Sequence, residues 1–545
     1  MSINSSRRKF TSLALGLPVP AVLFPRLHNP GGVQLPSGEL LGVYFNVRDF
    51  GAAGDGNRLE TQAIQSAVEA CARAGGGVVY LPAGTYLSGT IYFRSGVTLH
   101  LAEGSTLLGS PNLSDYPVTI PEFRSYSDNY TERSLLYGEK VERIGITGKG
   151  VIDGQSSAFQ GDYKVRPFIM RLVQCRQVSV SELTFQNSPM WVQHYLACED
   201  VQIRGIRVRS RCCTVNHDGL DIDSCQRVRV ADCDISSEDD AIVLKSTSAL
   251  PCRDIVITNC IISSRINALK FGTDSAGGFE NIAISNITVY ETGAAGIALE
   301  IVDGGLMDRV TITNIVMRET ACPVFIRLGD RGRTWQSGMP RPGIGKLRNV
   351  VISNIQATGA DDIGCCITGL PGHEVENVSL ENLSISFRGG GTREAARRQI
   401  PEEAESYPEY NMFGVLPAYG FYCRHISGLS LVNLTLAYEK PDLRPSLVCD
   451  DVVNLNLSRI SAASQPDGEP LIRLDQVRKA WLESCRATTS AHTFLQVNGG
   501  QSAGIRLMAN DFSNVSKAVE LNSDVPAGEV QSCSCRNLIP SRRVH

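Results

Sequence analysis

Three aspartates in a short stretch of the sequence could carry out acid–base chemistry. Asp218 is followed 21 and 22 residues later by Asp239 and Asp240, and Lys245 comes next. Carboxyl groups held close together raise one another's pKa, so one of them can stay protonated near neutral pH as a general acid. The other carboxylates can activate water, and this division of roles suits glycoside hydrolysis. A calcium site or a turn-capping cluster would use the same residue types, so spacing alone leaves these alternatives open.

A repeated motif of the form V-x-I-x-N-I would position these residues. It occurs twelve times between residues 178 and 510, and most copies begin 23 to 28 residues apart. Such a period, with alternating β-branched residues, is typical of a solenoid built from strands. The alternation turns Val, Ile and Leu inward. We therefore predict an all-β fold, a right-handed parallel β-helix.

The fifth position of the motif predicts how the coils turn. It is Asn at 259, 286, 314, 354 and 382. Asn tolerates the left-handed backbone of a tight turn, and its side chain can bond the equivalent Asn one coil away.

Two further segments define the domain organisation. Residues 58–74 predict a short helix that caps the N-terminal end, with one apolar face formed by Ala63, Ile64, Ala67, Val68 and Cys71. Intervals of 40 and 51 residues between motif copies indicate insertions, the longer at about 388–427. This insertion is rich in aromatic residues and could bind a ligand or simply pack. We predict one β-helix domain over 44–545, with its N-terminal cap over about 44–110.

The N-terminal residues indicate where in the cell the protein is located. Arg7 and Arg8 precede a mildly apolar run, and this pattern resembles a twin-arginine export signal. We expect a signal over 1–26, a linker over 27–43, and a periplasmic or secreted protein. A disordered basic N-terminus of a cytosolic protein is the alternative.

Composition limits the partners and cofactors. A formal net charge of −4 offers no basic face for nucleic acid, and no later stretch approaches the ~20 apolar residues of a membrane span. The 17 cysteines include no C-x-x-C pair with zinc-like partners, so we expect mostly small core residues. We expect no cofactor, no metal, no nucleic acid, no membrane contact after export, and a monomer that binds carbohydrate.

The phase of the repeat predicts which polar residues stack on neighbouring coils. Counting ten residues back from successive motif copies gives one column, about 5 Å between neighbours: Asp218, Lys245, Gly272 and Glu300. Counting two residues further back gives a second column: Asn216, Val243, Lys270 and Ala298. Asp239 and Asp240 have a different phase in this count.

Several local motifs strengthen the hydrolase interpretation. They are DFGAAGDG from Asp49, NSPMW from Asn187, NHDG from Asn216, EDD from Glu238 and IVLKS from Ile242. Over residues 45–309 the chain resembles glycoside hydrolase family 28, the polygalacturonase and rhamnogalacturonase family of the pectin-lyase-like β-helices. The resemblance implies inversion by a directly attacking water. It makes Asp239 the general acid, while Asp218 and Asp240 position and deprotonate the water.

The chain departs from the family pattern at two places. The family's G-H-G is missing, and Asn267 aligns with its histidine. The family's R-x-K, which holds a uronate carboxylate, falls on residues 298–300 and ends in Glu300. Arg265 or Lys270 could supply the missing charge. We expect a pectic or otherwise acidic polysaccharide or oligosaccharide, with these substrate-binding candidates: Asn216, Lys245, Arg265, Asn267, Lys270, Glu300 and His194.

Two other functions remain open on the sequence. A polysaccharide lyase on the same scaffold would need a calcium-bridged uronate and an Arg or Lys base, and the aspartates could hold calcium. A non-catalytic β-helical glycan-binding protein would explain the missing histidine and R-x-K. An unsaturated product and sensitivity to chelators would identify the lyase.

Overall fold

The computed structural model describes residues 44–211 and 216–533. The predicted export signal over 1–26 and the linker over 27–43 lie outside the described residues. In the described part of the chain, no helix is long and apolar enough to cross a membrane.

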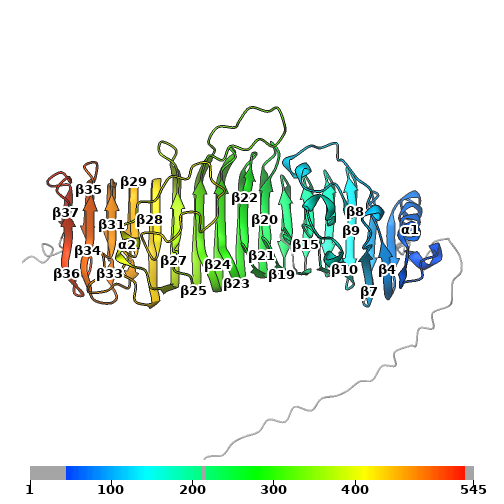
Figure 1. Cartoon of the computed structure of the whole chain (residues 1–545), viewed down its shortest axis with the longest axis horizontal. Coiled ribbons are helices and arrows are strands. Elements are labelled where there is room, and N and C mark those ends of the chain that lie inside the picture. Colours follow the sequence, from blue (N-terminus) through cyan, green and yellow to red (C-terminus); the bar gives the residue numbers. More distant parts are fainter. Residues whose placement is uncertain (1–43, 212–215, 534–545) are drawn as a thin grey trace, which may run out of the picture. The chain divides into compact units, whose positions relative to one another are not determined.

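The described residues form a right-handed parallel β-helix, as predicted. Figure 1 shows the strands stacked in sequence order, from α1 (Thr61–Arg73) and β4 at one end to β37 at the other. All the paired strands run parallel, and each coil pairs with the next; β12, for example, places Val178 opposite Val201 of β15. Both valines are at most 2% exposed, so the apolar positions of the motif face the core as predicted.

The coils stack into three strand faces. The face that carries the aspartates is called the site face below, and it contains β5 (Ile91–Tyr92), β8 (Ser134–Glu139), β11 (Phe168–Val173), β14 (Gln193–Leu196), β17 (Leu220–Asp223), β20 (Ile242–Ser246), β22 (Leu269–Ser275), the ends of β23 (Phe279–Ile301) and β24 (Leu306–Leu328), β26 (Cys365–Thr368), the beginnings of β28 (Phe421–Lys440) and β29 (Leu447–Ser458), β31 (Ile472–Asp475), β34 (Ala491–Asn498) and β36 (Val515–Leu521).

The repeated motif lies on the second face, called the motif face. It contains other parts of β23, β24, β28 and β29 together with β1 (Tyr44–Asn46), β3 (Gly77–Leu81), β6 (Val97–Leu101), β9 (Glu142–Gly148), β12 (Arg176–Ser181), β15 (Glu199–Arg204), β18 (Gln226–Ala231), β21 (Cys252–Ser264), β25 (Lys346–Ala360), β27 (Val375–Gly389), β32 (Arg478–Glu483), β35 (Ala503–Met508) and β37 (Val530–Cys533). The third face includes β2 (Asp55–Leu59), β4 (Gly84–Ser88), β7 (Ser105–Gly109), β10 (Val151–Asp153), β13 (Thr184–Gln186), β16 (Arg207–Ser210), β19 (Asp234–Ser237), β30 (Ser461–Ala462) and β33 (Arg486–Ala487).

The predicted asparagine ladder is present at the turn after the motif. The five asparagines all have positive φ between 55° and 59°. The Asn286 side chain donates to Asn259 at 3.2 Å, and Asn314 donates to Asn286 at 3.2 Å. The insertion before residue 350 interrupts the series, since Asn354 donates to Thr313 instead. The ladder therefore fixes the turn and links neighbouring coils, as the sequence predicted.

The predicted capping helix is α1, which lies at the N-terminal end of the stack (Figure 1). Its buried residues are Ile64, Ala67, Val68 and Cys71, and Ala63 is only partly buried. They join the main core, so the helix shields the first coil from water.

The cysteines behave as core residues. Thirteen cysteines between Cys71 and Cys485 are free thiols, and all thirteen are buried. Several stack on successive coils: the Cys198 backbone N–H donates to the Cys225 thiol at 3.3 Å. The fold is therefore stabilised at these positions by packing rather than by disulfides.

The predicted insertion leaves the solenoid after β27 and returns at β28. It contains the one-turn helix α2 (Arg393–Ala396) and lies against the site face. Arg327 of β24 donates to the Glu402 carbonyl at 2.7 Å, and Arg424 of β28 donates to the Ile400 carbonyl at 2.7 Å. One buried and one partly exposed arginine on the sheet therefore hold the insertion in place.

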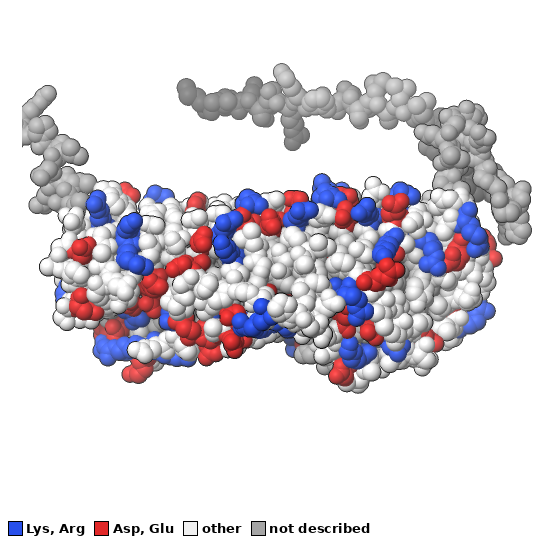
Figure 2. Space-filling model, turned by 90° about the horizontal axis from the view of Figure 1, so that it is seen from above, with Lys and Arg blue, Asp and Glu red and all other residues white. Residues whose placement is uncertain are grey.

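Charged side chains of both signs are interspersed over the face shown in Figure 2. No continuous basic stripe is visible among the described residues on that face. This distribution agrees with the small net charge of the chain.

Candidate active site

The register of three adjacent coils brings the acidic residues together. Leu220 of β17 pairs with Ile242 of β20, which pairs with Leu269 of β22. Asp218, Asp240 and Asn267 each lie two residues before these positions, so they occupy the same place on successive coils. The Asn267 side chain donates to Asp240 Oδ1 at 2.9 Å, which confirms the stacking.

This register corrects the predicted first column. Lys245 pairs with Asp223, not with Asp218, and Asp240 shares the phase of Asp218. Counting back from the motif copies misplaced Asp218 because the connections from the site face to the motif face differ in length. The connection after β20 is five residues longer than the one after β17: Lys245 lies seven residues before Cys252, whereas the equivalent Asp223 lies two residues before Cys225. The second column is right for Val243, Lys270 and Ala298, which pair across β20, β22 and β23.

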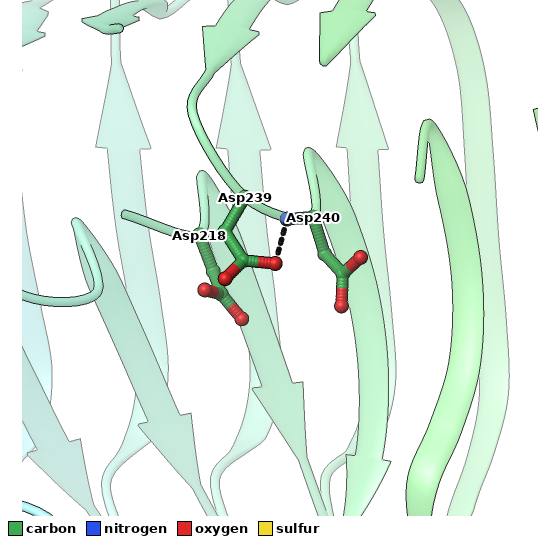
Figure 3. Close-up of side chains that lie close together, drawn as sticks. All are labelled: Asp218, Asp239 and Asp240. Carbon is green, nitrogen blue, oxygen red and sulfur yellow. Dashed lines mark hydrogen bonds between the residues drawn. The ribbon is translucent and has the colours of Figure 1, made fainter. Parts of the chain in front are cut away.

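The three aspartates form one cluster, shown in Figure 3. One carboxylate oxygen of each lies within 4.8 Å of the others. Asp218 and Asp240 are each 3% exposed, while Asp239 is partly exposed beside them. Backbone N–H groups of Asp240 and Asn216 donate to the two oxygens of Asp239, at 2.9 and 3.1 Å. The loop thus holds the more accessible carboxyl group above the two buried ones.

Two buried lysines neutralise part of this negative charge. Lys245 Nζ lies 3.1 Å from Asp218 Oδ2 and 3.2 Å from Asp221 Oδ1. Lys270 Nζ lies 3.2 Å from Asp240 Oδ2. Lys245 Nζ also lies 4.5 Å from the centroid of the Trp191 ring, a cation–π contact. Asp218 and Asp240, the two buried catalytic candidates, are therefore each paired with a lysine ammonium group.

Burial is the main influence on the proton affinities of Asp218 and Asp239. It raises the pKa of Asp218 to about 7 against the opposing charge of Lys245. Burial, and then the charge of Asp240, also raise the pKa of Asp239. Closely coupled groups titrate together, so near neutral pH the cluster binds a proton that is not assigned to one carboxyl group. One carboxyl group can therefore donate a proton while another accepts one.

A small cavity of about 80 Å³ opens over the cluster. Tyr130 and Trp191 line it from the N-terminal coils, and their ring centroids lie 4.9 Å apart. Tyr407 of the insertion lines it from the C-terminal side, where its hydroxyl lies 2.9 Å from Thr273 Oγ1. The aromatic insertion therefore does reach the site.

Two arginines that the sequence analysis missed also line the cavity. Arg331 donates to Asp303 and lies 3.8 Å from Asp274 Oδ1. Arg333 forms an ion pair with Asp274, and its guanidinium carbon lies 3.5 Å from the Tyr126 ring centroid. They come from the 40-residue interval after the motif copy at 310, whose R-x-R pattern was the available signal.

The remaining candidates differ in their relation to the cavity. Arg265 is an exposed residue outside the cavity lining, 3.1 Å from Glu238. His194 is fully buried below Trp191 and lies 3.2 Å from Asp223. Asn267 is fully buried and acts on Asp240, and Asn216 lines the cavity.

Glu300 is fully buried, and neither of its carboxyl oxygens has a hydrogen-bond partner among the described residues. Burial raises its pKa to about 8, although the charge of Lys270 opposes this. A neutral carboxyl therefore replaces the cation that the family pattern has at this position. It cannot hold an anionic sugar from this position.

Glu300→Gln should stabilise the protein at alkaline pH. The raised folded pKa means that the folded state loses stability as pH rises from the unfolded value, near 4.5, to about 8. The neutral variant avoids this loss, so its free energy of unfolding should exceed wild type by about 4 kcal/mol at pH 8 and nearly match it at pH 4.5. Urea titrations at both pH values would measure this. Equal differences at both would contradict a buried titrating carboxyl.

The family comparison shows which family the chain belongs to. The sequence model of "Glycosyl hydrolases family 28" matches residues 80–405, more than half of the chain and the stretch that holds all three aspartates. The chain belongs to this family.

Individual relatives match over shorter stretches. A "Probable polygalacturonase" of Vitis vinifera is 35% identical over 36% of this chain and 43% of that protein. An "Exo-poly-alpha-D-galacturonosidase" of Dickeya chrysanthemi is 38% identical over 22% of this chain and 21% of that protein. The chain thus spans less than half the length of either relative.

A solved structure supports the fold. The exopolygalacturonase of Thermotoga maritima superposes with a TM-score of 0.58, at 21% identity, over 72% of this chain and 91% of that chain. At this identity the likeness establishes the β-helix alone.

Proposed function

We propose that this protein is an inverting glycosidase that removes residues from the end of an α-linked galacturonan. The observation that carries the proposal is the cluster of Asp218, Asp239 and Asp240, held together on two coils within a chain of family 28. The names of its relatives point to galacturonides as the substrate.

The cluster can perform each step of hydrolysis. Asp239 is the accessible carboxyl with a raised pKa, so it protonates the departing glycosidic oxygen. Asp218 and Asp240 position a water molecule, and one of them takes its proton as the water attacks the anomeric carbon. Their oxygens lie closer together than the ~6.5–9.5 Å between the carboxyl groups of many inverting enzymes. Inversion is therefore proposed from family membership rather than from spacing.

The lysines disfavour the lyase alternative. Burial alone would lower the pKa of Lys245 and Lys270, but neighbouring carboxylates raise both well above the usual value. Protonated lysines are poor bases for β-elimination. Two ammonium groups also occupy the positions from which Asp218 and Asp240 would otherwise attract calcium.

The walls of the cavity support attack at a chain end. Arg333 stacks on Tyr126, so a loop from the N-terminal coils meets the loop after β24 across the site face. Tyr407 closes the C-terminal side. A cavity bounded in this way accepts the end of a polymer more readily than its middle.

A product assay would test the proposal. Purified protein would be incubated with de-esterified polygalacturonan, with its reduced oligomers and with neutral pectic glycans, with and without a calcium chelator. We expect new reducing ends and a monomeric or dimeric product, with little early loss of viscosity and no effect of the chelator. Ultraviolet absorbance from an unsaturated uronate would show a lyase, and unmodified substrates would favour the binding protein.

Arg331→Ala should raise KM for galacturonans with a smaller change in kcat. The proposal makes Arg331 and Arg333 the groups that hold the uronate carboxylate, since Glu300 cannot. A charged hydrogen bond contributes about 1.5–3 kcal/mol, which corresponds to a KM about 10- to 100-fold higher. Initial rates over a range of oligomer concentrations would measure it. An exposed arginine such as Arg506, changed to Ala, is the control, and equal KM values would remove Arg331 from the substrate site.

Export remains part of the proposal. Its support is the twin-arginine pattern around Arg7 and Arg8 and the polymeric substrate, which would be met outside the cytoplasm. Fusion of residues 1–43 to a reporter, with Arg7 and Arg8 changed to Lys, would test it by loss of export.

A further inference from the structure

A second groove lies on the site face beyond the insertion. Its volume is about 620 Å³, and its floor consists of outward side chains of β28, β29, β31 and β34. These strands continue the sheet that carries Lys245 and Lys270. Arg473 of β31 lies six coils beyond Lys270 of β22, on the order of 30 Å at ~4.8 Å per coil. The groove is therefore separate from the catalytic cavity.

The insertion separates the two sites and contributes to both. Tyr407 lines the catalytic cavity, while residues 397–400 line the groove. The insertion forms one wall of the groove and is held to the strands of the floor by two hydrogen bonds. Arg473 donates to the Ala396 carbonyl at 2.7 Å, and Arg424 donates to the Ile400 carbonyl at 2.7 Å. The groove thus keeps its shape without a ligand.

The floor is a regular row of polar groups. Arg424, Asp450, Asp475 and Asn498 occupy equivalent positions on four successive coils. Their mutual contacts hold them in place: Asn498 donates to Asp475 at 2.6 Å, and Arg424 lies 3.3 Å from Asp450. Polar groups recur at the spacing of the coils, which is close to the length of one sugar unit in a polysaccharide.

Two groups in this groove have unused hydrogen-bonding capacity. The side chain of Gln496 makes no hydrogen bond with any of the described residues. The Arg398 side chain donates only to the Val415 carbonyl, at 3.0 Å, and has no carboxylate within 4.0 Å in the described ranges. Planar amide and guanidinium groups can each bond two adjacent oxygens, and guanidinium suits a carboxylate best.

The charge of the lining selects among glycans. The groove contains four arginines and three carboxylates, and the arginine without a carboxylate partner is Arg398. Tyr422, the one aromatic residue of the lining, is 3% exposed and offers no stacking surface. Recognition here must therefore use hydrogen bonds and one unpaired cation rather than ring stacking.

We propose that this groove is a second glycan-binding site that holds a segment of a uronate-bearing polysaccharide away from the catalytic cavity. It would keep the enzyme on its polymer between cleavages. The proposal requires binding at the groove and does not depend on hydrolysis at the aspartate cluster.

Binding to polygalacturonan would be measured by affinity electrophoresis and calorimetry, in an Asp239→Asn background that slows turnover at least about 100-fold. The test variant is Arg398→Ala with Gln496→Ala, and Arg506→Ala on the motif face is the matched control. We expect the double variant to bind the polymer at least 10-fold more weakly and to lose one of two binding sites per chain. In the otherwise wild-type enzyme, kcat/KM for trigalacturonate should stay unchanged.

Three results would overturn the inference: equal polymer affinity in the double variant and the Arg506→Ala control, a single site in both proteins, or equally strong binding of a neutral glycan. The binding measurement does not depend on turnover. If the product assay showed no hydrolysis, the proposed function would be refuted, but the measured affinity for polygalacturonan would still test the second site. Thermal unfolding of each variant would confirm that the groove residues are not required for folding.

Discussion

Replacing Asp239 with Asn should lower kcat by about 10²–10⁴-fold and leave KM nearly unchanged. The amide has almost the shape of the carboxyl group, and its oxygen can keep one of the two hydrogen bonds from the backbone N–H groups of Asp240 and Asn216, although its NH2 group cannot accept the other. It cannot supply the proton that the leaving oxygen needs. Initial rates of reducing-end release from oligogalacturonides would measure both constants.

A matched control is Asp524→Asn, an exposed aspartate on a distant coil, which should retain wild-type rates. A substrate with an activated leaving group needs less protonation, so Asp239→Asn should lose less activity on it. A loss of less than 10-fold on the natural linkage would contradict the role of Asp239 as the acid.

Lys245→Met should reduce the free energy of unfolding by up to about 3–5 kcal/mol, with the loss growing as pH rises above 7. The ammonium is buried between Asp218 and Asp221, so its removal leaves two buried carboxyl groups without their cation. Methionine fills a similar volume, so packing should change little. Urea unfolding of the variant and of Lys149→Met, an exposed control, would measure the difference.

The pH dependence separates this electrostatic cost from a packing defect. Burial already raises the pKa of Asp218 to about 7 and that of Asp221 well above its usual value. Without Lys245 both rise further, so the variant loses stability relative to the wild type only at pH values where the wild-type carboxyl groups ionise, from about pH 7 upward. The deficit should be near zero at pH 4 and should grow as pH rises above 7. An equal deficit at both would indicate lost packing instead.

The sequence predicted the solenoid well because its cause is local and repeated. Alternating apolar residues and an asparagine at the turn specify a coil whose neighbours complete it, and the structure has both features. Helix α1 was predictable for the same reason, since its apolar face lies within one segment.

The site was predictable only in part, because corners of different length change the phase between faces. The motif face is separated from the site face by corners that differ by five residues around β17 and β20, so the count misplaced Asp218 relative to Lys245. Arg331 and Arg333 reach the cavity from an insertion whose path no repeat specifies. His194 was a substrate-binding candidate, and nothing local in the sequence showed that it is buried against Trp191.

The central claim is hydrolysis with inversion at the Asp218, Asp239 and Asp240 cluster. Proton NMR of fresh enzyme acting on an α-linked oligogalacturonide tests it most directly, because the anomeric signal appears before the product mutarotates. We predict that the β-anomer forms first, that no vinyl signal of an unsaturated uronate appears, and that Asp239→Asn abolishes the early signal. First appearance of the α-anomer would contradict inversion, and a vinyl signal would contradict hydrolysis.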